Sequence, residues 1–331
     1  MSESRSPSGV LPPELAPVLP PLPAGRFDWW DALTRVLSSI EAVREGRALY
    51  LLLSAFSGGG LALATARASL GRGEPQWAVF QAAIGLFIAF YGSNAAGLLM
   101  MDRALGRPPR DVIDALEDAL GIAHRVLVAL LGMVLVGAGL AGALLGLLWL
   151  CGLPKVGPWL FAGVVPLSVA VVGLVVVAGG AVVGPLTGPS VWLGASSWQS
   201  FRTLAGLIRR HLLLAAVLAV TLSGLTGLVG AATSLVVMLG GRVMAEASVW
   251  MLGIDLAPEV LMVGLFGGGL QSINPAALPK DAVAHTAAAA IGGGVVFAVA
   301  LVLPTAVYLR GVCEVYLTLM RHSQRSATHT R

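Results

Sequence analysis

Two amide side chains, Gln81 and Asn94, lie within the apolar stretch 77–101, where most other side chains are hydrophobic. An amide in lipid is costly unless it is hydrogen-bonded, so such residues either line a cavity for a polar solute or bond to a neighbouring helix. Bonding between helices is the commoner use. We therefore interpret Gln81 and Asn94 first as helix–helix contacts and second as candidate binding residues.

Arg310 and Glu314 form a second candidate site, because residues four apart face each other on a helix. The placement of the final span decides the role of this pair. If lipid surrounds 287–309, the two side chains lie in the cytoplasmic interface as an ordinary surface pair. If lipid surrounds 297–320, they form an ion pair inside the membrane, which usually indicates function. The sequence favours the first placement.

A third group lies in the apolar segment 240–286, where Asp255 and Glu259 fall one helical turn apart. Together with His285 these carboxylates could bind a cation. Their spacing matches no established metal motif, so we predict no metal site. The sequence also lacks the GxxxxGK[ST], HExxH and GxSxG motifs. We therefore predict no cofactor, no catalytic residues and no enzymatic activity.

The composition indicates that membrane-spanning helices position these residues. Hydrophobic residues make up 56% of the chain and charged residues 11%, against about 25% charged residues in soluble domains. A helix needs about 20 apolar residues to cross a bilayer. We predict an all-α, polytopic membrane protein with six transmembrane helices at about 49–66, 77–101, 126–150, 159–186, 212–239 and 287–309. The stretch 256–270 is too short to span, so we expect an interfacial or re-entrant helix there.

Basic residues set the orientation, because cytoplasmic segments carry an excess of Lys and Arg. With the N-terminus inside, all but five of the 21 basic residues fall on the cytoplasmic side, and the exceptions are Arg67, Arg72, Lys155, Arg242 and Lys280. Tryptophans such as Trp149 and Trp192 fall at span ends, as in an aromatic belt. We predict a bacterial cytoplasmic (inner) membrane protein with both termini in the cytoplasm. This topology explains the net charge of +4, so no nucleic-acid partner is expected.

Three amphipathic segments, 27–47, 110–126 and 196–211, each precede an outward-going span. In the second segment apolar residues recur at helical spacing and acidic residues fall mostly on the opposite face, which is typical of helices lying in a membrane interface. The second and third segments also align, with Gly121 on Gly206. We predict three cytoplasmic interfacial helices and a possible internal repeat, although a sequence rich in Gly, Leu and Ala also produces such matches.

The chain is expected to hold one membrane domain, 27–321, between two tails. Residues 1–26 are rich in proline, which predicts a disordered cytoplasmic tail, and 322–331 form a second disordered tail. The predicted topology places Cys151 and Cys313 on opposite sides of the membrane, which excludes a disulfide between them.

Three stretches carry a resemblance to known families: "RALGRPPRDVIDALEDAL" between two spans, then "SSWQSFRTLAGLIRRH", and a final helix ending in "VYLTLMR". Their arrangement resembles bacterial six-helix membrane families, including the membrane domain attached to some glycerophosphodiester phosphodiesterases. The likeness covers most of 30–321. No phosphodiesterase domain accompanies it here, so that activity is not expected. The families themselves mostly lack an assigned mechanism.

These observations favour a non-enzymatic role as a scaffold or transport-associated subunit of a membrane complex. The partners would be membrane lipids and either another protein or further copies of the chain. The alternative is a small-solute or ion transporter or channel with a polar cavity near Asn94 or in the outer acidic segment. An intramembrane enzyme ranks third, because no catalytic set is visible.

Overall fold

The computed structural model describes residues 28–108, 110–153, 157–252 and 292–329. Every regular element in these ranges is a helix. Six helical stretches are long and apolar enough to cross a membrane: Gly46–Gly71, Pro75–Ala104, Val112–Leu150, Gly157–Trp192, Ser197–Met251 and Gly292–Gln324. The prediction of an all-helical chain with six apolar spans is confirmed, and the chain has the build of a multi-pass membrane protein.

The described part of the chain begins with α1 (Trp29–Leu37), which continues into the short 3₁₀ helix η2 (Ser38–Arg44). The carboxylate of Asp28 accepts a hydrogen bond of 2.8 Å from the backbone N–H of Trp30, which satisfies one free donor at the helix start. Ala32 and Val36 are buried, and α1 packs against α7 and α10. This element corresponds to the first amphipathic segment.

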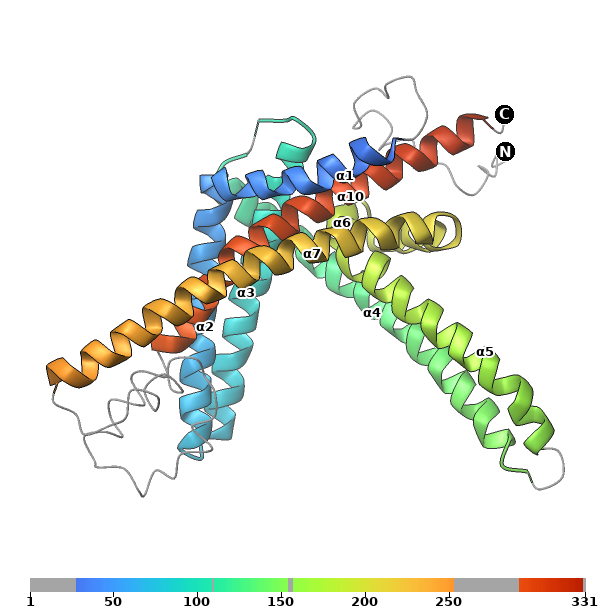
Figure 1. The fold of residues 1–331 in the computed structure, drawn as a ribbon, viewed down its shortest axis with the longest axis horizontal. Coiled ribbons are helices and arrows are strands. Elements are labelled where there is room, and N and C mark those ends of the chain that lie inside the picture. Colours follow the sequence, from blue (N-terminus) through green and yellow to red (C-terminus); the bar gives the residue numbers. More distant parts are fainter. Residues whose placement is uncertain (1–27, 109, 154–156, 253–291, 330–331) are drawn as a thin grey trace.

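The first membrane hairpin consists of α2 (Gly46–Gly71) and α3 (Pro75–Ala104), which lie side by side (Figure 1). Glycines let the two backbones approach closely. A Cβ atom built on Gly59 would lie 2.9 Å from the carbonyl oxygen of Gly85, and one built on Gly85 would lie 2.8 Å from that of Gly59. Only glycine fits such a contact. The turn between the helices uses Gly73, whose φ of +79° suits glycine best.

The second hairpin consists of α4 (Val112–Leu150) and α5 (Gly157–Ala178), and it extends away from the first (Figure 1). The chain then passes through a π-helical turn, η3 (Gly179–Val183), into α6 (Gly184–Trp192). Pro185 and Pro189 lie in α6 and cannot donate backbone hydrogen bonds, which weakens regular helical bonding in this stretch.

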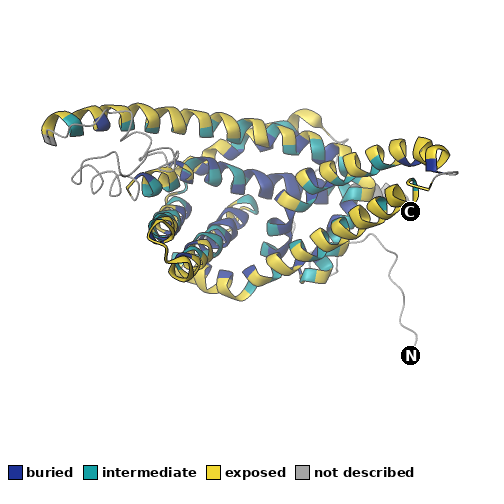
Figure 2. Cartoon of the chain, turned by 90° about the horizontal axis from the view of Figure 1, so that it is seen from below, coloured by how far each residue is buried: buried dark blue, intermediate teal, exposed yellow. Residues whose placement is uncertain are grey.

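The last two long helices are α7 (Ser197–Leu252), with non-helical dihedral angles at His211, and α10 (Val302–His329). Helix α10 is central because its two faces enter two different cores. One face packs against α2 and α3 through Ala306, Leu309, Cys313 and Leu317. The other packs against α1 and α7 through Val312, Val315, Tyr316 and Leu319. Buried residues accordingly gather in the middle of the molecule (Figure 2).

Three helices continue past residues at which the sequence analysis ended a segment. Helix α4 runs without a break from Val112, so residue 126 is not a helix boundary: the change from charged to apolar residues there contains no helix breaker. Helix α7 continues past residue 239 to Leu252, aided by an ion pair of 3.0 Å between Arg242 and Glu246 one turn apart. Helix α10 continues past the predicted domain end at residue 321, because no Gly or Pro follows before His329.

Other predictions are not settled by these helices. The interfacial position of the three amphipathic segments and the internal repeat stay predictions. Residues Asp255, Glu259 and His285 and the stretch 256–270 lie outside the described residues, as do the whole N-terminal tail 1–26 and residues 330–331.

Candidate functional site

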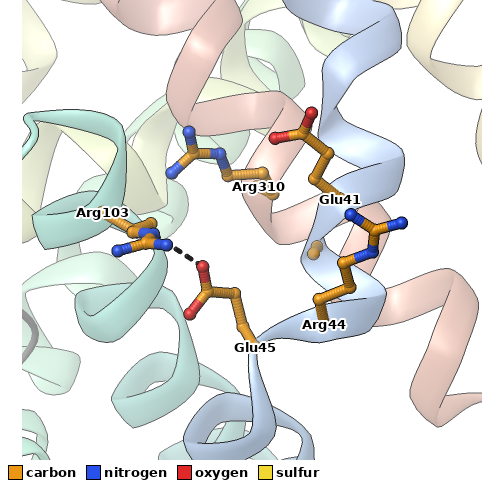
Figure 3. Close-up of a pocket in the computed structure, with 6 residues that line it drawn as sticks. Glu41, Arg44, Glu45, Arg103 and Arg310 are labelled. Carbon is orange, nitrogen blue, oxygen red and sulfur yellow. Dashed lines mark ion pairs between the residues drawn. The ribbon is translucent and has the colours of Figure 1, made fainter.

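A cavity of about 230 Å³ lies where four elements meet (Figure 3). These are η2, the N-terminal end of α2, the C-terminal end of α3 and the first half of α10. Its lining consists of Glu41, Ala42, Arg44, Glu45, Arg103 and Arg310. Five of the six lining residues carry charge, and we call this cavity the charged pocket.

Local structure places each charge at the pocket. The 3₁₀ geometry of η2 brings residues three apart onto one side, which aligns Glu41 with Arg44. Glu45 is the residue before α2, and its side chain makes no capping hydrogen bond. Arg103 lies in the last turn of α3, where the helix dipole favours a positive charge. Its Nε lies 2.7 Å from a carboxylate oxygen of Glu45, which joins α3 to the start of α2.

Arg310 comes from α10 and carries a second ion pair. Its Nη2 lies 2.8 Å from a carboxylate oxygen of Glu314, one turn further along the helix. Its Nη1 also donates a hydrogen bond of 3.4 Å to the carbonyl of Met100 on α3. The side chains of Arg310 and Glu314 are 17% and 10% exposed, so the pair lies between helices and not on an outer surface. Two charges removed from water in this way need each other, because either one alone would be strongly destabilising.

The structure therefore brings together the predicted residues Arg310 and Glu314 and adds partners that sequence reasoning missed. Glu41, Arg44 and Glu45 form one dense charged run, "EAVRE", directly before the first span. Arg103 marks the end of the next span. Charged residues at adjacent span ends were the available signal, but nothing in the sequence indicates that the final helix packs against both of them.

A second charged cluster lies beside the pocket and ties α3 to α4. The guanidinium of Arg110 donates two hydrogen bonds to Asp102, of 2.7 and 2.9 Å, and one of 2.6 Å to Asp118. Bonding to the Asp102 carboxylate raises the pKa of Arg110 above its ordinary value. Arg47 on α2 donates to the carbonyl of Arg110 at 3.2 Å. This arrangement fixes the turn between the two hairpins.

The two amides in α3 lie away from the pocket and are engaged in hydrogen bonds. The amide nitrogen of Asn94 donates a hydrogen bond of 2.9 Å to the carbonyl of Phe90. The amide oxygen of Asn94 accepts a hydrogen bond of 3.0 Å from Nε1 of Trp192 on α6. The amide oxygen of Gln81 accepts a hydrogen bond of 3.0 Å from the hydroxyl of Ser69 on α2. The bonds to Trp192 and Ser69 join different helices, which is the use that the sequence favoured, and the bond to Phe90 lies within α3.

In the part of the chain that the structure describes, the histidines and cysteines form no reactive cluster. The rings of His211 and His322 meet edge to face with centroids 4.9 Å apart, at the irregular turn of α7. Cys151 and Cys313 are both free. Within the described ranges no group of three or more His, Cys, Asp or Glu side chains is placed to hold a metal ion.

Comparisons of the chain with protein-family models, with curated proteins and with solved structures gave no match. The likeness to six-helix membrane families therefore stays a prediction from the residue pattern.

Proposed function

We propose that this chain is a non-enzymatic scaffold or transport-associated subunit of a complex in the bacterial cytoplasmic membrane, with both termini in the cytoplasm. The α4–α5 hairpin is the surface on which it meets another chain. One observation carries the proposal: this hairpin has glycines at the spacing that joins helices in membranes, and they contact nothing in the described structure.

The spacing is that of a small-xxx-small motif. Ala138, Gly142 and Gly146 follow one another at intervals of one helical turn on α4, and all three are exposed. A Cβ atom built on Gly142 or Gly146 would meet no other atom within 4 Å. In lipid, small residues at this spacing let a second helix approach closely.

Lipid alone is a weaker explanation for this surface. Glycine in a helix is less favourable than alanine by about 1 kcal/mol, and lipid tails pack equally well against larger apolar side chains. Neighbouring exposed positions on the hairpin are in fact large, for example Leu135, Leu145 and Leu148. A helix packed against the small-residue face would offset the cost of its glycines.

The test compares the assembly state of three chains extracted in mild detergent: wild type, Gly142→Leu with Gly146→Leu, and Gly121→Leu. Gly121 is also an exposed α4 glycine with open space around it, so it controls for helix propensity. We expect wild type and Gly121→Leu in a stoichiometric complex and the double variant as a single chain of 33.9 kDa. A wild-type protein that is already a lone chain, with nothing copurifying, would overturn the proposal.

A second candidate function, transport of a small polar solute, is favoured by the charged pocket. It predicts that a transported solute raises the thermal stability of the protein by binding the folded form. That stabilisation should be lost when Arg310 is replaced by Gln but kept in the Gly142→Leu, Gly146→Leu variant. The two candidate functions are thus distinguished by the region that each requires: the charged pocket for transport and the α4–α5 hairpin for assembly.

A further inference from the structure

We propose that the charged pocket binds a phosphoethanolamine group, a phosphate joined to a primary ammonium, and that the ligand is the headgroup of a phospholipid. The proposal does not depend on the α4–α5 surface, because the pocket lies between η2, α2, α3 and α10.

The charged side chains of the pocket are only partly paired with one another. Arg103 is already paired with Glu45, and Arg310 with Glu314. Arg44 and Glu41 line the same cavity but form no ion pair with any other residue in the described part of the chain. The pocket thus keeps one positive and one negative group uncommitted. A ligand that carries both charges satisfies both groups, whereas a simple anion would face the Glu41 carboxylate and a simple cation would face Arg44.

The second step is the type of each charge. Three guanidinium groups line the cavity, and guanidinium matches the oxygens of a phosphate in geometry as well as in charge. Helix α2 starts at the pocket without a side-chain cap, so the positive end of its dipole adds to the attraction for an anion. In the same cavity, the Glu41 carboxylate can accept hydrogen bonds from a primary ammonium, which has three N–H donors. A quaternary ammonium has none.

The third step is size and position. A cavity of about 230 Å³ is far larger than the roughly 10–15 Å³ that one water needs, so it has room for a group of the size of phosphoethanolamine. The pocket lies at the ends of two apolar spans, α2 and α3, which is the depth at which phospholipid headgroups lie.

The fourth step distinguishes a lipid from a soluble zwitterion. Leu49 and Leu53 follow Glu45 by one and two turns on the same face of α2, toward the apolar middle of the span. Leu53 is 43% exposed and Tyr50, beside this face, is 64% exposed. This apolar surface continues from the pocket and suits an acyl chain, which a free phosphoethanolamine molecule does not have.

The experiment measures thermal stabilisation of the full chain in detergent by four probes. These are short-chain phosphatidylethanolamine, phosphatidylcholine and phosphatidylglycerol, and free phosphoethanolamine. We expect the apparent Kd for phosphatidylethanolamine to be at least tenfold lower than for the other three. Equal binding of the three lipids would overturn the assignment of the headgroup. Binding of free phosphoethanolamine as tight as that of its lipid would overturn the assignment to a lipid.

Two variants locate the site. Arg44→Gln should weaken phosphatidylethanolamine and phosphatidylglycerol alike by at least tenfold, because both lose a phosphate contact. Glu41→Gln should not weaken the binding of phosphatidylglycerol, because it removes a repulsive carboxylate, and it should remove the preference for phosphatidylethanolamine. Arg72→Gln and Glu74→Gln, an exposed ion pair at the other end of α2, serve as matched controls and should bind like wild type. If Arg44→Gln and Glu41→Gln also bind like wild type, the pocket is not the site.

If a glutamine variant fails to fold, Arg44→Lys or Glu41→Asp takes its place in the same assay, because these variants keep the charge. Arg44→Lys should retain binding with a several-fold loss, because lysine offers a point charge in place of the planar fork. Lipids that copurify with the wild-type chain give an independent readout by native mass spectrometry. Retained phosphatidylethanolamine supports the proposal, and retention in proportion to the membrane composition overturns it.

Discussion

The two membrane hairpins of this chain differ in what their glycines do. In α2–α3, Gly59 and Gly85 meet backbone to backbone, and 56% of the most apolar 18-residue window of the α3 span is buried. In α4–α5, Gly142 and Gly146 meet nothing, and the corresponding fraction for the α4 span is 11%. The same residue type therefore serves packing within the chain in one hairpin and leaves a surface available in the other. Glycine content alone does not distinguish the two; only the partner helix does.

The largest expected effect comes from filling the contact inside the first hairpin. Gly85→Leu places a side chain against the carbonyl of Gly59, where a Cβ alone would lie at 2.8 Å. The helices must separate, which should lower the free energy of unfolding by about 3 kcal/mol. Denaturation in mixed detergent micelles measures this. Gly58→Leu is the matched control on α2, because its Cβ would meet only Ile88, at 3.8 Å. Equal losses in both variants would mean that the close approach does not hold the hairpin together.

The link between the hairpins gives the next effect. Asp102 is 5% exposed and accepts two hydrogen bonds from Arg110, so Asp102→Asn should lower the free energy of unfolding by about 2 kcal/mol. Asp118→Asn removes a contact to the same guanidinium. The Asp118 side chain is 56% exposed, so this control should lose less than about 1 kcal/mol. If the order of the two is reversed, the buried carboxylate is not what fixes the turn between α3 and α4.

A smaller effect is expected where the first hairpin meets α6. Asn94→Leu leaves the indole N–H of Trp192 without its acceptor, which should reduce the free energy of unfolding by about 1 kcal/mol and change the tryptophan emission. Ser93→Ala is a control on the next residue, because the Ser93 hydroxyl bonds only within its own helix, to the carbonyl of Ala89. A loss of solute binding in Asn94→Leu with unchanged stability would instead support the transport candidate.

The sequence predicted the elements better than their ends or their neighbours. Long apolar runs dictate helices in lipid, because every backbone group must be bonded within its own segment, so six spans could be predicted. The end of the second amphipathic segment could not, since a change of polarity at Val126 does not break a helix. Trp192 illustrates the missing information. Its position at a span end suggested an aromatic belt, but the structure places its N–H on Asn94, a residue 98 positions away.

The candidate site shows the same limit. Spacing on one helix predicted the Arg310–Glu314 pair, because the i, i+4 relation is local. The charged pocket combines Glu45 and Arg103, which the α2–α3 hairpin brings together, with Arg310, which reaches them because α10 packs against both helices. Such a meeting depends on packing between helices far apart in the chain, and no local pattern encodes it.

The smallest effect on stability is expected on the second hairpin, and it is the one that separates the two hairpins most clearly. Gly142→Leu meets no atom within 4 Å and replaces a poor helix former by a good one, so the isolated chain should gain up to about 1 kcal/mol. Denaturation in a detergent that keeps the chain monomeric measures this gain. Assembly in native membranes should fall in the same variant, because leucine blocks the approach of a second helix. A variant that is more stable as a single chain and less assembled in the membrane would show that these glycines contact a partner. If this face met only lipid, the substitution would not reduce assembly.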